Sequence, residues 1–127
     1  MAEMSHHENI SLLAYSPLAG GFLTGKYMED KVPDNSRLSR VPSLFGRIND
    51  NSTLAVKEYV LLAKKYNLDP VHMALAFCNQ RPFMGSVIFG ATDNIQLTNI
   101  LKGLEVVLSE EIMLEINKLY KRFPITF

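Results

Sequence analysis

Glycine, hydroxyl and lysine side chains gather directly after an apolar run near the start of the chain. Residues 10–15 are largely apolar, and the loop 16–26 that follows carries Ser16, Thr24, Lys26 and three glycines. Glycine permits positive φ angles and a close approach of the backbone, and lysine is a mobile cation. Backbone amides, hydroxyls and cations bind phosphate oxygens. The segment therefore predicts a strand that leads into a phosphate-binding loop.

A second apolar run ends in a similar arrangement. Residues 86–89 form a short, largely apolar run with β-branched side chains, which predicts a buried strand. Gly90 follows this run. Asp93 and Gln96 have the spacing of a capping box, so a helix is expected to begin there. The free amides and the positive dipole end of a helix N-terminus favour an anion. A phosphate site after this strand is the functional interpretation.

Each segment alone also has a structural explanation. A strand followed by proline and glycine is common in βα connections that bind nothing. Thr92 and Asp93 could cap the helix without a ligand. On the residues alone, both alternatives stay open.

The amino-acid sequences of these segments resemble those of one enzyme superfamily. Residues 14–27 resemble the seventh-strand region of the aldo-keto reductases, and residues 86–97 resemble the eighth strand and the helix after it. Residues 68–77 resemble the helix between them. The match is closest to the bacterial NADP(H)-dependent reductases that also resemble potassium-channel β subunits. The resemblance covers nearly the whole chain.

The resemblance implies a cofactor and a reaction. Similar enzymes transfer hydride between NADPH and an aldehyde or ketone. By this resemblance, Tyr15 would stack on the nicotinamide ring. The residues implied along the pyrophosphate are Ser16, Pro17, Leu18 and Gly20, with Lys26 nearby. Those implied at the adenosine phosphate end are Arg37, Thr92, Gln96 and Asn99, with Gly90 at the exit of the second strand.

The residues after Gln96 depart from the family pattern. The family often has asparagine four positions after this glutamine, where the present chain has Ile100, and Asn99 comes one position earlier. A helix turns by about 100° per residue, so the two positions point in different directions. A preference for NADP over NAD is therefore inferred from the family, with Lys26 and Arg37 joining Gln96 as phosphate partners.

The chain length predicts an incomplete barrel. A (β/α)8 barrel has about 250 residues, and this chain has 127. We expect residues 1–127 to form a single partial α/β domain, the C-terminal portion of a TIM barrel. It would hold two parallel strands with flanking helices and a C-terminal helix, and would not close by itself.

The resemblance also implies that catalysis needs more than this chain. The family's catalytic aspartate, tyrosine, lysine and histidine lie upstream of the matched residues, so we assign no catalytic residue. The chain alone is expected to be inactive, and to use an aldehyde or ketone only with the missing N-terminal half. One origin that the sequence leaves open is that the chain is a fragment of a longer enzyme.

An alternative function is a non-catalytic one. A regulatory or interaction half-barrel would have lost catalysis and would act through protein contacts. Nucleotide sensing is one role that the resemblance to channel β subunits suggests for it. Two parallel strands leave unpaired backbone groups at their edges. Such edges allow an oligomer or a swapped pairing between chains.

Composition excludes several other classes. Lysine plus arginine and aspartate plus glutamate each number 13, so no net positive field attracts nucleic acid or anionic lipid. Apolar runs fall short of the roughly 20 residues of a membrane span, and the N-terminus has no signal-peptide pattern. Cys78 is the single cysteine, which excludes an intrachain disulfide and fits a reducing compartment. We expect a cytoplasmic protein.

The elements around the two loops follow from apolar spacing and capping signals. Helices are expected near residues 1–8, 52–66, 70–80, 93–103 and 109–123. The stretch 27–50 predicts a long loop with Arg40 and Arg47 on its surface. His72 is expected to pack or cap, Cys78 to be buried and inert, and the strand at 10–15 to be covered on both faces.

Overall fold

A computed structural model describes residues 2–124 of the chain. The helices are α1 (Ala2–His7), α2 (Arg37–Arg40), α3 (Asp50–Lys65), α4 (Pro70–Asn79), α5 (Asn94–Lys102) and α6 (Glu110–Arg122). The strands are β1 (Leu12–Tyr15) and β2 (Met84–Ile88), and the short 3₁₀ turns are η1 (Ala19–Thr24), η2 (Met28–Asp30), η3 (Pro42–Leu44) and η4 (Gly103–Glu105). Every helix and strand that the sequence predicted is present. The expected loop at 27–50 instead holds η2, α2 and η3.

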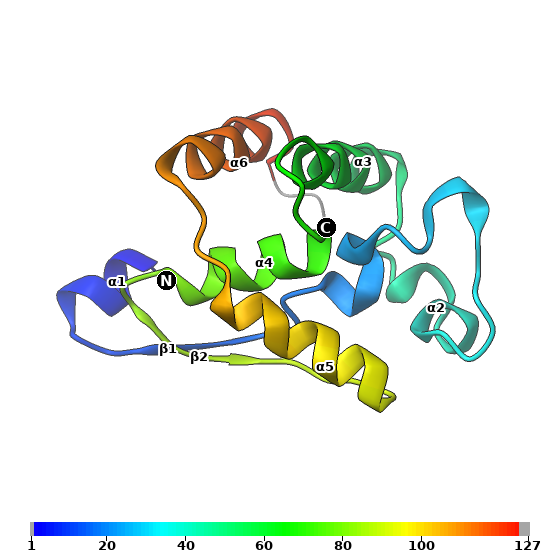
Figure 1. Cartoon of the computed structure of the whole chain (residues 1–127), viewed down its shortest axis with the longest axis horizontal. Coiled ribbons are helices and arrows are strands. Elements are labelled where there is room, and N and C mark those ends of the chain that lie inside the picture. The colour runs from blue at the N-terminus through cyan, green and yellow to red at the C-terminus, as the bar shows by residue number, and fades with distance from the viewer. Residues whose placement is uncertain (1, 125–127) are drawn as a thin grey trace.

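The two strands form a parallel sheet and lie side by side (Figure 1). Leu13 pairs with Ser86 and Tyr15 with Ile88, so the strands end at the same edge of the sheet. Parallel strands require a crossover connection, and α3 and α4 lie within that connection.

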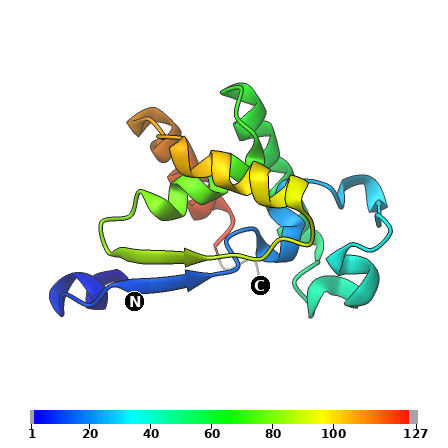
Figure 2. The same cartoon turned by 60° about the horizontal axis from the view of Figure 1, so that its bottom comes forward.

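Only one face of the sheet is covered by the described residues. Figure 2 shows α4 and α5 above the strands, and Val71, Leu75 and Ile100 of these helices pack with Val87 and Phe89. Alternate side chains of a strand point to opposite faces. The large apolar side chains that point away from the helices are exposed: Leu13 by 62%, Tyr15 by 75% and Ile88 by 50%. The expectation that the first strand is covered on both faces is therefore wrong for this chain, because no described element packs on the second face.

The main core lies between α3, α4 and α6. Its buried members are Leu62, Ala63, Met73, Ala76, Leu108, Ile112 and Ile116. The apolar spacing of residues 109–123 predicts Tyr120 on the buried face of the last helix together with Ile112 and Ile116, but its side chain is 61% exposed. Tyr120 lies eight positions after Ile112, and at 100° per residue this drift carries it to the edge of the apolar stripe.

A second core closes the region that was expected to be a loop. Its buried members are Ala19, Phe22, Tyr27, Leu44, Val56 and Val60. Leu44 is only 1% exposed, and the Tyr27 hydroxyl accepts a hydrogen bond from the Leu38 amide at 3.4 Å. The segment between η1 and α3 is therefore packed against its own apolar cluster, which holds it next to the end of β1.

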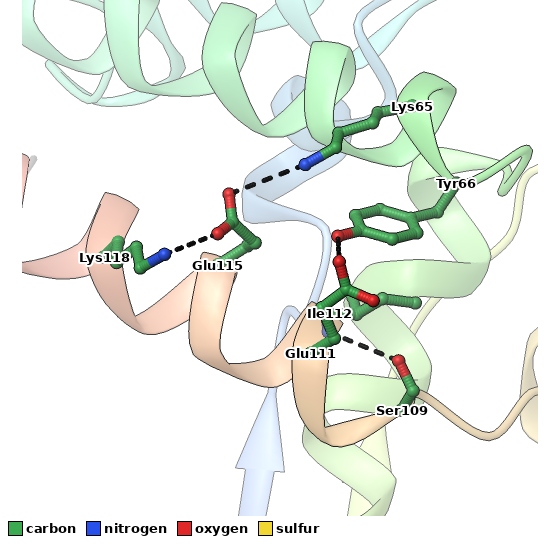
Figure 3. A network of polar contacts seen from close by, with 7 residues as sticks. All are labelled: Lys65, Tyr66, Ser109, Glu111, Ile112, Glu115 and Lys118. Carbon is green, nitrogen blue, oxygen red and sulfur yellow. Dashed lines mark hydrogen bonds and ion pairs between the residues drawn. The ribbon is translucent and has the colours of Figure 1, made fainter.

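Polar contacts reinforce the joint between α3 and α6 (Figure 3). The Tyr66 hydroxyl donates to Glu111 Oε1 at 2.8 Å. Glu115 accepts from Lys118 Nζ at 2.7 Å and lies 3.9 Å from Lys65 Nζ. These groups are largely exposed, so packing of the buried Ile112 and Ile116 is the main source of stability here.

None of the helices between residues 2 and 124 is both long and apolar enough to cross a membrane.

Candidate functional site: the shared end of the two strands

The loops that follow the strands start next to each other. The Ser16 amide donates to the Ile88 carbonyl at 2.9 Å, which extends the ladder one step past the end of β1. The segments 16–26 and 89–93 therefore leave the sheet from one edge. In open and barrel α/β folds, the carboxyl ends of parallel strands are where ligands bind.

The first of these loops turns tightly and uses left-handed backbone. Ser16 has φ 61° and Ala19 φ 49°, and Gly20 and Gly21 have φ 69° and 91°. The Ala19 amide donates to the Ser16 carbonyl at 2.9 Å. A residue other than glycine in this region costs roughly 1–2 kcal/mol. Such strain persists where surrounding structure enforces it, and it is frequent at ligand-binding loops.

The ammonium of Lys26 and the aliphatic stem of Arg37 lie against this loop. A Cβ atom placed on Gly21 would be 3.3 Å from Lys26 Nζ, and one on Gly20 would be 4.0 Å from Arg37 Cγ. Arg37 is the first residue of α2, whose N-cap Ser36 accepts from the Ser39 amide at 3.2 Å. The structure thus brings the start of α2 next to this loop, and the Arg37 guanidinium carbon lies 5.9 Å from the centre of the Phe45 ring.

Leu18 lies on the core side of the loop. Its side chain packs against Val71, Leu75 and Ile100, on the side of the sheet that α4 and α5 cover. Any contact of Leu18 with a ligand would therefore come from its backbone. Its neighbours Ser16 and Pro17 line the surface on the opposite side.

The second loop is open at Gly90 and capped at Asp93. A Cβ atom on Gly90 would meet nothing within 4 Å, so packing within the chain does not require glycine there. Asp93 Oδ1 accepts from the Gln96 amide at 2.8 Å, and Asp93 Oδ2 accepts from Gln96 Nε2, also at 2.8 Å. Gln96 Oε1 in turn accepts from the Thr92 amide at 3.3 Å. The predicted cap is confirmed, and Gln96 is part of it.

Asn99 faces α4 and does not join Gln96 in the cap. Asn99 Nδ2 donates to Asp69 Oδ2 at 3.1 Å. His72 Nε2 lies 2.9 Å from the Asn99 carbonyl and 3.0 Å from its Oδ1, and because both are acceptors the ring nitrogen is the donor. His72 packs in this joint as expected. Asp69 also caps α4 by accepting from the Val71 amide at 2.7 Å.

A hollow of about 420 Å³ opens beside the end of β1. It is lined by Tyr15, Ser16, Pro17, Ala19, Leu23 and Arg47. Arg47 was expected on the surface, and it is instead half-buried in this wall. The sequence around it, Gly46 before and Asn49 after, indicates only a turn followed by a helix start. No local pattern shows which way the arginine points.

Cys78 is not activated as a nucleophile, and the described residues hold no group of metal ligands. Burial raises the pKa of the Cys78 thiol, with Arg81 opposing the shift, so the thiolate is disfavoured. The side chain is only half-buried, less than the sequence predicted. Within residues 2–124, no three histidine, cysteine, aspartate or glutamate side chains are grouped so as to hold a metal ion.

The geometry agrees with what known proteins show. The model of the aldo/keto reductase family matches residues 1–121. The chain belongs to the aldo/keto reductase family. The similarity predicted from its two loop motifs is thereby confirmed.

Relatives of this family chain include bacterial, protozoan and plant proteins. Protein tas of Escherichia coli K12 is 40% identical over 122 residues, which are 95% of this chain and 35% of that protein. An aldo-keto reductase of Babesia bovis is 44% identical over 91 residues, 69% of this chain and 32% of the relative. A probable voltage-gated potassium channel subunit beta of Oryza sativa subsp. japonica is 34% identical over 101 residues, 77% and 31% of the two chains. The chain spans about a third of the length of these relatives.

A solved structure shows the same fold. The glycerol dehydrogenase of Gluconobacter oxydans superposes with a TM-score of 0.70 at 20% identity, over 98% of this chain and 38% of that one. The chain is an α/β portion of a TIM barrel whose two parallel strands do not close a barrel. In such a barrel the helices lie outside. Leu13, Tyr15 and Ile88 therefore lie on the face that points to the barrel interior.

Proposed function

We propose that residues 1–127 form the single partial domain that binds NADP(H) in an aldo-keto reductase. The enzyme would transfer hydride between NADPH and an aldehyde or ketone. The observation that carries the proposal is the shared strand end, where the Ser16–Ile88 hydrogen bond sets a left-handed, glycine-containing loop beside the open exit at Gly90. Membership of the family supports the choice of ligand.

The donor set of this edge fits a dinucleotide phosphate. Lys26 supplies positive charge next to Gly21, and Gly90 leaves room for a close approach. The aliphatic stem of Arg37 lies beside Gly20, and its guanidinium would turn from the Phe45 ring toward the phosphate. The residues that would hold the cofactor are Tyr15, Ser16, Pro17, Leu18 through its backbone, Gly20, Lys26, Arg37, Gly90, Thr92 and Gln96. Asn99 enters the proposal only as the residue that fixes α5 against α4.

The division of labour follows from these residues. The nicotinamide supplies the hydride when it is bound. The chain itself would bind and orient the cofactor, with the exposed Tyr15 ring as a platform on the interior face of the sheet. The proton donor is proposed to lie in the part of the relatives that this chain does not span, so the chain alone would turn over no aldehyde.

The two cations also favour NADP over NAD. An arginine near the adenosine ribose accommodates the 2′-phosphate of NADP. Arg37 is proposed for this contact, with Gln96 released from Asp93 to assist. NADPH is expected to bind at least about tenfold more tightly than NADH, as one charge-assisted hydrogen bond to phosphate provides.

A fluorescence titration with NADPH tests the proposal. The chain is titrated alone and together with the part of protein tas outside the matched region, supplied as a separate polypeptide. Binding in at least one case, weakened by K26Q and left unchanged by K57Q, is expected. Lys57 is an exposed lysine of α3 and serves as the matched control. Absence of NADPH binding in both cases would refute the proposal.

A second candidate function is an interaction half-barrel without catalysis. The exposed interior face at Leu13, Tyr15 and Ile88 favours it, because uncovered apolar sheet faces associate with other chains. It predicts a dimer or larger assembly by analytical ultracentrifugation that dissociates when Leu13 is changed to lysine. A monomer with high NADPH affinity would argue against this candidate.

The setting proposed for either function is the cytoplasm. Cys78 is the single cysteine, and its partly buried thiol is suited to a reducing compartment. The balance of 13 basic and 13 acidic residues argues against nucleic acid as a partner. Fractionation of the native protein would test the location.

A further inference from the structure

The hollow beside β1 has one charged residue among its described lining residues, Arg47. The other lining residues are Tyr15, Ser16, Pro17, Ala19 and Leu23, which offer a ring, a hydroxyl and apolar surface. A cavity with mostly apolar walls and a single fixed cation has the composition of a small-molecule site in which the charge orients the ligand. The wall is built from two segments, the end of β1 with its loop and the turn before α3.

The backbone of Arg47 is held firmly on both sides. The Ser52 hydroxyl donates to the Arg47 carbonyl at 2.7 Å, and Ser52 has no exposed surface. The Arg47 amide donates to the Leu44 carbonyl at 3.4 Å, and Leu44 is 1% exposed in the second core. Two buried residues thus fix where this arginine starts.

A strained turn delivers the arginine to the hollow. Ser43, Leu44, Phe45 and Gly46 all have left-handed backbone, with φ 52°, 50°, 61° and 80°. Three of these residues are not glycine, and each costs about 1–2 kcal/mol in this conformation. The opposite wall of the hollow carries the left-handed Ser16 and Ala19. Strained residues on both walls of one hollow are typical of a ligand clamp.

We propose that Arg47 binds an anionic oxygen group, a phosphate or a carboxylate, of a ligand that occupies the hollow beside Tyr15. The planar guanidinium presents paired donors that match either group. Two sources can supply the anion: the phosphate next to the nicotinamide in the cofactor, or a carboxylate on the carbonyl substrate. The inference rests on the proposed function, because it assumes that Tyr15 faces the reacting end of the cofactor.

The test compares R47Q and R47K with R40Q in the form of the protein that binds NADPH. Arg40 is an exposed arginine whose Nη2 donates to the Asn35 carbonyl at 3.0 Å, outside the hollow, and provides the control. The ligands are NADPH, reduced nicotinamide mononucleotide, adenosine 2′,5′-bisphosphate, benzaldehyde and 4-carboxybenzaldehyde. Binding is followed by amide chemical shifts of the loop after β1, and folding by thermal unfolding.

R47Q is expected to weaken one class of anion about tenfold or more. R47K, which keeps the charge but loses the fork, should weaken it less. A loss for the mononucleotide and NADPH, with adenosine bisphosphate unchanged, identifies the cofactor phosphate as the source. A loss confined to 4-carboxybenzaldehyde, with benzaldehyde unchanged, identifies the substrate carboxylate.

Unchanged affinity of R47Q for every ligand overturns this inference and leaves the proposed function intact, since the wild-type chain still binds NADPH. A loss as large in R40Q also overturns it, because the effect would then be one of general charge. If the wild-type chain binds none of the nucleotides in either form, the proposed function fails first and this inference with it.

Discussion

Asn99 on α5 donates a hydrogen bond to the carboxylate of Asp69, the N-cap residue of α4, at 3.1 Å. The same asparagine receives the Nε2 proton of His72. Both ends of its amide are thereby used to hold α5 on α4. This joint therefore stabilises the packing of α5 on α4.

Replacing Asn99 with alanine should destabilise the fold without removing a cofactor contact. Asp69 and His72 would each lose a partner, which costs about 1–3 kcal/mol in the free energy of unfolding. NADPH affinity, compared below the unfolding transition, should change less than twofold. Urea unfolding and fluorescence titration check the two values. A large drop in NADPH affinity with unchanged stability would instead indicate that Asn99 contacts the cofactor.

Two glycines of the same region should respond oppositely to alanine. Gly90 has open space around its Cβ position, so G90A should keep the stability of the wild type and weaken NADPH binding if a ligand lies there. A Cβ on Gly103 would lie 3.0 Å from both His72 Cα and Leu75 Cδ1. G103A should cost about 1–3 kcal/mol through overpacking. Thermal unfolding beside titration separates them; equal NADPH affinity of G90A and wild type would contradict the cradle at Gly90.

The carboxylate of Asp93 occupies the Gln96 backbone amide, one of the amides at the start of α5 that an anion would use. D93N keeps an oxygen for the Gln96 amide but removes the negative charge. Helix stability should therefore change little, since asparagine caps as well as aspartate. NADPH affinity should rise about fivefold, as expected for removing about 1 kcal/mol of repulsion near a helix N-terminus. An affinity that falls would show that Asp93 itself supports the bound ligand.

The polar contacts within α6 and between α6 and Tyr66 should make stability depend on pH at both ends of the scale. The Lys118 hydrogen bond and charge lower the pKa of Glu115, so this contribution is present above the ordinary glutamate pKa and is lost as pH falls through the lowered one. Hydrogen bonding to Glu111 raises the pKa of Tyr66, so that contribution is lost as pH rises through the raised value.

Substitutions show which side chain causes the loss of stability at each end of the pH range. E115Q should flatten the acid limb, and Y66F should flatten the alkaline limb, both slightly because the groups are exposed. I116A, which empties a buried position of the joint between α3 and α6, should cost about 2–5 kcal/mol at every pH. Thermal unfolding between pH 3 and 11 measures all three. A loss in Y66F as large as that in I116A would contradict the assignment of stability to packing.

Local signals predicted the elements well because their hydrogen bonds are local. Asp69 followed by proline, and Asp93 followed by Gln96, cap the helices that they were expected to cap. Burial on both faces of the first strand could not be judged in this way, because it depends on a layer that the described residues do not supply.

The candidate site was predicted from two loop motifs, and the structure adds two details that the sequence did not predict. The two loops and Lys26 were predicted from glycine, hydroxyl and cation content, and Arg37 from the family resemblance. In the structure Lys26 Nζ lies next to Gly21 and the aliphatic stem of Arg37 next to Gly20. The position of Arg47 depends on a left-handed turn formed mainly by residues other than glycine, and no sequence pattern predicts such a turn. The orientation of Asn99 depends on how α5 packs on α4, a tertiary property.

The central claim is that the ends of β1 and β2 form one ligand cradle. The most direct measurement is a ¹⁵N–¹H correlation titration with NADPH, in the form of the protein that binds it. Amides of residues 16–21 and of residues 90–96 should shift together and saturate along one curve. Shifts confined to one of these loops, or centred on another part of the chain, would contradict the account.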